Sequence, residues 1–105
     1  MPIDTRRGHL RGLDLRYLLT AYLHELGPLS VAQLVSELAH HGFELTGRPS
    51  KTISDALRWE RRRGRVIRVG RGRYAAGHMP RQTASRIKAR VRLLQEERVA
   101  ATWAD

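Results

Sequence analysis

Residues 50–76 read SKTISDALRWERRRGRVIRVGRGRYAA, and the hydrophobic period of this stretch changes at Gly64. Before Gly64 the apolar side chains recur at helical spacing, which predicts a helix from about Pro49 or Ser50 to Arg63. After Gly64 comes a short run of β-branched residues, a glycine-rich turn and a returning strand, which is typical of a β-hairpin. The predicted strands are residues 65–69 and 73–76, joined by Gly70-Arg71-Gly72.

Two more helices are predicted upstream. The first covers about 13–26 and ends at Gly27-Pro28, and the second begins at Ser30, which forms a capping box with Gln33, and ends at Gly42. The apolar face of the first helix consists of Leu15, Leu18, Leu19, Tyr22, Leu23 and Leu26, and that of the second of Val31, Leu34, Val35 and Leu38. Between elements, we expect a brief strand contact from Leu29 and a core position for Phe43 and Leu45.

The elements therefore come in the order helix, helix, connector, helix, hairpin. This is the order of a winged helix-turn-helix domain, whose third helix enters the major groove and whose hairpin is the wing. The predicted fold class is α+β and mostly helical: three helices plus a two-stranded wing, with an added C-terminal helix. The predicted parts are a flexible basic arm over 1–12 with Arg6, Arg7 and Arg11, the winged-helix domain over 13–77, and the C-terminal helix over 78–105.

The C-terminal helix is expected over 81–104 and carries a narrow apolar stripe. Ile87, Val91 and Leu94 are spaced by four and three residues, the pattern of a coiled-coil seam, so a homodimer through this helix is predicted. The stripe is short, Arg98 takes the next apolar position, and the basic residues beside the stripe would repel a parallel copy. Two alternatives stay open, in which the helix folds back on the first helix of its own chain or lies along DNA.

The net charge is the most unusual property of the composition. The chain has 105 residues, with 20 Lys and Arg against 10 Asp and Glu, giving a net charge of +10. Residues 48–73 hold ten basic and two acidic residues, so 10 − 2 = +8 lies in this segment. Such a surplus predicts a polyanionic partner. The predicted DNA-contacting residues are Arg48, Lys51, Ser54, Arg58, Arg61, Arg62, Arg68, Arg71 and Arg73.

Within this segment, a projection at 100° per residue places Lys51, Asp55, Arg58 and Arg62 opposite the apolar stripe of the third helix. Asp55 is interpreted as a helix N-terminal acid, with acceptance of a hydrogen bond from cytosine N4 as the alternative. Trp59 is expected to pack against the hairpin or the first helix, with stacking on a base as its alternative. Arg71 is expected at the tip of the wing.

Several short motifs lie between residues 27 and 75. They are Gly27-Pro28-Leu29-Ser30, Leu34, Leu38, Gly42, Thr52-Ile53-Ser54, Leu57 and Arg68-Val69-Gly70-Arg71-Gly72-Arg73-Tyr74-Ala75. With these motifs, residues 13–76 resemble the helix-turn-helix domain called HARE-HTH, which restriction endonucleases share with eukaryotic chromatin proteins. The resemblance implies a winged-helix fold and a role in DNA binding, including the sensing of base modification. One relative lies in the delta subunit of bacterial RNA polymerase, so it also implies a precedent for protein contact.

The sequence predicts neither an enzyme nor a cofactor or metal site. The five His residues are scattered, no His-Glu-x-x-His pair exists, cysteine is absent, and no two acids are placed for hydrolysis. The glycines of the hairpin turn do not precede a helix, so they do not form a phosphate-binding loop.

The predicted function is therefore DNA binding, as a transcriptional regulator or nucleoid-associated protein with double-stranded DNA as partner. Because no apolar run resembles a secretory signal or a membrane span, the expected location is the cytoplasm, at the nucleoid, without membrane contact. The alternative is a winged-helix interaction module that binds a protein such as RNA polymerase. RNA binding is a third option, since charge alone does not distinguish it from DNA binding.

Overall fold

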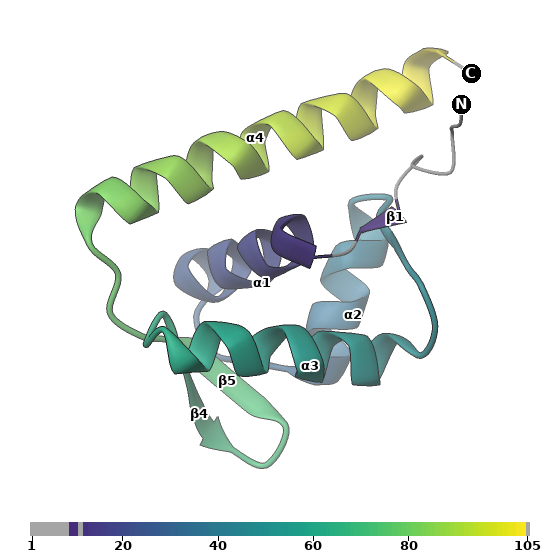
Figure 1. Ribbon diagram of the computed structural model, residues 1–105. Helices are drawn as coiled ribbons and strands as arrows, with labels where there is room; N and C mark the ends of the chain where they lie inside the picture. Colours follow the sequence, from purple (N-terminus) through teal and green to yellow (C-terminus); the bar gives the residue numbers. More distant parts are fainter. Residues whose placement is uncertain (1–8, 11, 105) are drawn as a thin grey trace.

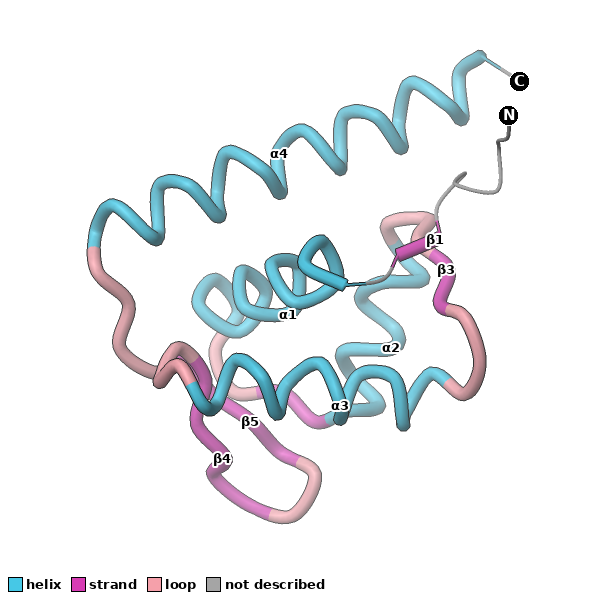
Figure 2. The backbone as a smooth tube through the Cα atoms, viewed as in Figure 1, coloured by secondary structure: helices cyan, strands magenta, loops and turns pink. Residues whose placement is uncertain are grey.

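A computed structural model describes residues 9–10 and 12–104, and over this part the chain is α+β and mostly helical (Figures 1 and 2). Four helices, a three-stranded antiparallel sheet and a two-stranded parallel pair make up the described residues. In chain order they are β1 (His9–Leu10), α1 (Gly12–Leu26), β2 (Leu29–Ser30), α2 (Val31–His40), β3 (Glu44–Leu45), α3 (Pro49–Arg62), β4 (Val66–Gly70), β5 (Arg73–Ala76) and α4 (Arg81–Ala104). The predicted helices and the hairpin are confirmed. Most of the observed bounds differ from the predicted ones by no more than one residue.

The helix starts follow local side-chain chemistry. The predicted capping box at α2 is confirmed, because the Gln33 backbone N–H donates to Ser30 Oγ at 3.1 Å and the Ser30 N–H donates to Gln33 Oε1 at 2.8 Å. Helix α3 begins with Pro49 in its first turn. A capping box of Thr52 with Asp55, which would start the helix later, does not form, because the Thr52 hydroxyl donates to the Thr46 carbonyl oxygen at 3.0 Å.

Helix α3 ends in a turn that aims the chain into the hairpin. Gly64 has a φ of +76°, which places it in the left-handed region that glycine adopts at low cost. The Gly64 N–H donates to the Arg61 carbonyl at 2.9 Å, and the Arg65 N–H donates to the Glu60 carbonyl at 3.1 Å. These two bonds form a Schellman motif, which satisfies the last carbonyls of the helix and fixes its exit.

The three-stranded sheet has the order β2-β5-β4, so the hairpin is tied to the start of α2. Leu29 pairs with Tyr74 and Ser30 with Arg73, which confirms the expected strand contact of Leu29. Within the hairpin, Arg68 pairs with Tyr74, and the register then shifts between Arg68 and Gly70. The hairpin projects from the body of the protein beyond this anchored end (Figure 1).

The parallel pair of β1 and β3 was not predicted. His9 pairs with Glu44 and Leu10 with Leu45. Leu10 is only 4% exposed, so the prediction of a flexible arm was wrong for this residue. The rest of the predicted arm, with Arg6, Arg7 and Arg11, lies outside the described residues.

One hydrophobic core joins all four helices. Its members include Leu18, Leu23, Leu34 and Leu57, each fully buried, and Phe43 takes its expected core position at 6% exposed. Leu26 was placed on the buried face of α1 but is 51% exposed, because it lies in the last turn, beyond the packed part of that face.

Helix α4 belongs to the same core. Ile87, Val91 and Leu94 are 1%, 8% and 7% exposed, and they lie in one cluster with the side chains of α1. Arg90 Nε donates to Asp14 Oδ1 at 3.0 Å, and Arg90 Nη2 donates to Oδ2 at 3.0 Å. The interpretation of this stripe as a dimer seam was wrong, because the chain covers it itself. The alternative in which the helix folds back on α1 is confirmed.

Candidate nucleic-acid interface

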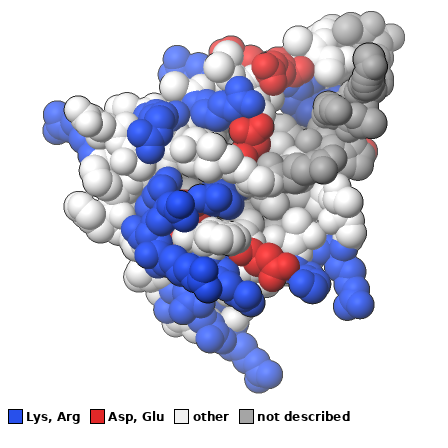
Figure 3. All heavy atoms as spheres, viewed as in Figure 1, with Lys and Arg blue, Asp and Glu red and all other residues white. Residues whose placement is uncertain are grey.

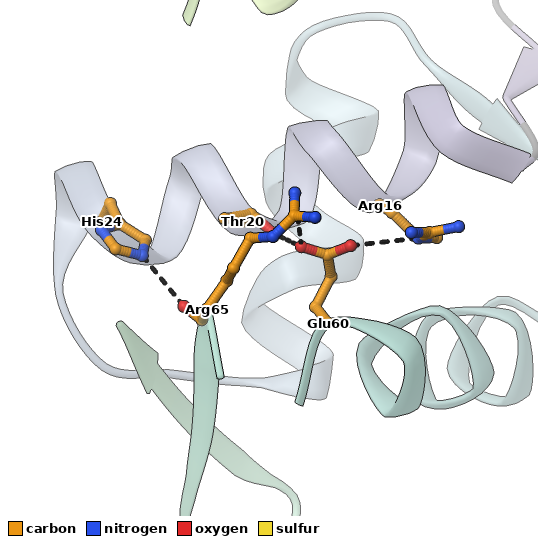
Figure 4. Close-up of polar contacts among 5 residues, drawn as sticks. All are labelled: Arg16, Thr20, His24, Glu60 and Arg65. Carbon is orange, nitrogen blue, oxygen red and sulfur yellow. Dashed lines mark hydrogen bonds and ion pairs between the residues drawn. The ribbon is translucent and has the colours of Figure 1, made fainter. Parts of the chain in front are cut away.

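A buried carboxylate fixes α3 against α1 (Figure 4). Glu60 is 0% exposed, and its two oxygens accept hydrogen bonds from Arg16 Nε at 3.0 Å and from Thr20 Oγ1 at 2.9 Å. The guanidinium of Arg65 adds an ion pair, with Nη1 at 3.7 Å from Glu60 Oε1. Because a buried charge is tolerated only where it is paired and hydrogen-bonded, these contacts set the rotation of α3 about its axis.

The base of the hairpin is fixed to the same region. His24, on α1, places Nε2 at 3.0 Å from the Arg65 carbonyl oxygen (Figure 4). The Gly77 N–H donates to that same carbonyl at 2.8 Å, and the His78 N–H donates to the Gly64 carbonyl at 3.0 Å. The end of α3, the base of the hairpin and the last turns of α1 are thus held together by hydrogen bonds.

With Glu60 turned inward, the opposite side of α3 faces out. Lys51, Arg58 and Arg62 are exposed there, as the sequence predicted, while Arg61 is exposed on the flank and Ser54 is half-buried. Lys51 Nζ donates to Asp55 Oδ2 at 2.9 Å, and this hydrogen bond lowers the pKa of the Asp55 carboxyl group. Arg48 lies at the exposed N-cap position of α3.

Trp59 lies on the flank of this exposed side. It is 49% exposed, and the guanidinium carbons of Arg16 and Arg62 lie 5.8 Å and 5.4 Å from the ring centroid. The expected packing against the first helix is therefore made through Arg16 and leaves half of the ring uncovered. Both distances are within the range of cation–π attraction, which limits the rotamers of the two arginines. The sequence did not single out Arg16, which contacts both Glu60 and Trp59.

The hairpin extends the charged side of α3. Arg68, Arg71 and Arg73 are all exposed, and Arg68 Nε donates to the Gly70 carbonyl at 3.2 Å. Figure 3 shows the basic side chains gathered over α3 and continuing down onto the hairpin. We call this set the α3–hairpin surface; it consists of Arg48, Lys51, Arg58, Arg61, Arg62, Arg68, Arg71 and Arg73.

Arg65 does not contribute to this surface. It was counted in the basic segment, but its side chain is only 13% exposed and faces Glu60. Arg65 and Glu60 neutralise each other, so both are left out of the surface charge. Nine basic residues and one acidic residue then remain in 48–73, and the net charge of the segment is again 9 − 1 = +8. The basic excess of the segment is therefore undiminished at the surface.

Two other features are absent from the described part of the chain. No group of three or more His, Cys, Asp or Glu side chains there could hold a metal ion. None of the helices in residues 9–10 and 12–104 is long and apolar enough to cross a membrane. Comparisons with protein-family models, with curated proteins and with solved structures found no match.

Proposed function

We propose that this protein is a winged-helix protein that binds double-stranded DNA, as a transcriptional regulator or a nucleoid-associated protein. The observation that carries the proposal is the α3–hairpin surface, on which the exposed basic side chains of a helix and of the adjoining hairpin are continuous. In this proposal α3 enters the major groove and the hairpin contacts the backbone beside it.

The chemistry of the surface fits a duplex. Seven of its eight cations are arginines, whose planar guanidinium groups bind phosphate and the guanine edge in a bidentate manner. The buried ion pair at Glu60 and the hydrogen bonds at the hairpin base hold the two elements at a fixed angle, so little ordering would be needed on binding. The likeness of the hairpin sequence to HARE-HTH domains also supports this function.

Duplex binding is expected to depend strongly on salt. If about six phosphates are neutralised, the plot of log K against log salt concentration has a slope of about −5. Fluorescence anisotropy with a labelled duplex at several salt concentrations measures it, with single-stranded DNA and RNA of the same sequence as comparisons. A slope shallower than about −2 would contradict the role of the α3–hairpin surface. Tighter binding to RNA than to the duplex would favour the RNA alternative.

The double substitution Arg58→Ala and Arg62→Ala is expected to weaken duplex binding while leaving the thermal melting temperature nearly unchanged. Both side chains are exposed on the side of α3 opposite Glu60. Leu57→Ala is the matched change on the buried side, where Leu57 is 0% exposed, and it should cost about 2–5 kcal/mol of stability. Thermal melts and binding titrations on the same samples separate the two effects. If the double variant bound the duplex with unaltered affinity, the DNA would not contact this side of α3.

A further inference from the structure

Helix α4 carries a second basic surface, separate from the one on α3. Residues 81–92 contain five basic residues and no acidic residue. Arg90 is paired with Asp14, whereas the other four basic side chains are exposed. We call these four the α4 surface: Arg81, Arg86, Lys88 and Arg92.

Helix α1 separates the α4 surface from α3. On α1, Arg16 and Thr20 contact Glu60 of α3, whereas Asp14 contacts Arg90 of α4. At 100° per residue, Asp14 lies roughly 120–160° around the helix from Arg16 and Thr20, so α3 and α4 cover opposite sides of α1 (Figure 1). Two successive helix packings place the axes of α3 and α4 about 16–20 Å apart. Figure 3 shows the basic side chains of the two regions as separate groups with a largely uncharged band between them.

Over residues 81–92, the outer side of α4 is basic and carries no acidic side chain. The buried stripe that includes Ile87 and Val91 points toward α1, so the opposite line of the helix, with Ser85 and Ala89, points outward. These two side chains are small and exposed; Arg86 lies on one side of them, and Arg81, Lys88 and Arg92 lie on the other. A strand of phosphates can therefore lie along this line with cations on either side of it. The packing of α4 on α1 and the Arg90–Asp14 pair hold the helix that carries these cations in place.

We infer that the α4 surface binds a second DNA duplex, so that a single chain bridges two DNA molecules. The inference rests on the proposed function, because it requires the first duplex on the α3–hairpin surface. A duplex on the outer side of α3 lies against α3 and the hairpin, while the α4 surface lies beyond α1, on the side away from α3 (Figure 1). Contact with phosphates needs only fixed positive charges, and it is independent of sequence.

The test is a bridging assay. One duplex is immobilised on beads, a labelled second duplex is added, and the label retained by the protein is measured. The unsubstituted 105-residue chain is expected to retain it. The variant Arg81→Gln, Arg86→Gln, Lys88→Gln and Arg92→Gln, whose net charge is 10 − 4 = +6, is expected to lose at least about tenfold of the retained label. Its affinity for a single duplex, measured by anisotropy, should stay within about threefold of the parent.

Two controls make the outcome specific. Glu96→Gln with Glu97→Gln alters two exposed charges on the same helix and should leave bridging intact. Light scattering of the free protein and of the quadruple variant reports self-association, and circular dichroism melts report folding. If the quadruple variant folds and still bridges, a second protein copy joins the duplexes and the inference is overturned. Binding of one duplex without bridging also overturns it but leaves the proposed function standing. If the protein bound no duplex at all, the proposed function itself would be wrong.

Discussion

Replacing Glu60 with alanine is expected to lower the free energy of unfolding by about 3–5 kcal/mol, the usual cost of removing one partner of a buried ion pair. The carboxylate is 0% exposed and accepts from Arg16 and Thr20, so both donors lose their acceptor. Arg65 loses its ion pair as well, and its side chain is only 13% exposed. Urea unfolding followed by circular dichroism measures the change.

The matched control for Glu60 is Asp55, an acid on the exposed side of the same helix. Its hydrogen bond to Lys51 joins two side chains that are 49% and 70% exposed, and such surface pairs contribute little. Asp55→Ala should therefore leave the unfolding free energy nearly unchanged. A third variant, Glu60→Gln, keeps the shape and one acceptor and should fall between the other two. Equal stability of Glu60→Ala and Asp55→Ala would mean that the buried pair does not hold α3 in place.

The position of Glu60 could have been found in the sequence. It lies seven residues after Ile53 and three after Leu57, so the helical projection that separates the charged side from the apolar side places it on the buried stripe. What the sequence could not supply are its partners. Arg16 and Thr20 lie 44 and 40 residues earlier in the chain, and no local pattern joins them to α3.

The stripe on α4 shows a different limit. Ile87, Val91 and Leu94 predict that one side of the helix is covered, and they are indeed buried. The pattern does not distinguish packing against a second copy of the chain from packing against α1 of the same chain, because either arrangement would bury the same three side chains. The contact that distinguishes them is the pair of Arg90 with Asp14, which are 76 residues apart. By contrast, α3 and the hairpin could be predicted from the local hydrophobic period and from the residues at the helix ends and the turn. The same hydrophobic period also predicted which of their cations are exposed.

Gly77→Ala is expected to be as damaging as the loss of Glu60, because the glycine packs directly on backbone. A Cβ at residue 77 would overlap the carbonyl oxygen of Gly64 and lie 3.0 Å from the carbonyl carbon of Arg65. These are backbone atoms at the base of the hairpin, so no flexible side chain can move aside. Overpacking of this kind costs about 1–3 kcal/mol or more. Relief of the clash would stretch the Gly77–Arg65 and His78–Gly64 hydrogen bonds, each worth about 0.5–1.5 kcal/mol.

The total expected for Gly77→Ala is about 2–6 kcal/mol, measured by urea unfolding against Gly70→Ala as control. Gly70 lies in the same hairpin, but the atom nearest to an added Cβ is Arg73 Cβ at 3.9 Å, an ordinary van der Waals contact. Gly70→Ala should therefore be close to the parent in stability. Because the base of the hairpin also fixes the angle between the hairpin and α3, duplex affinity measured well below the melting temperature should fall for Gly77→Ala and hold for Gly70→Ala. If Gly77→Ala and Gly70→Ala unfolded at the same urea concentration, the base of the hairpin would accommodate the added methyl group without loss of stability, and the prediction would be wrong.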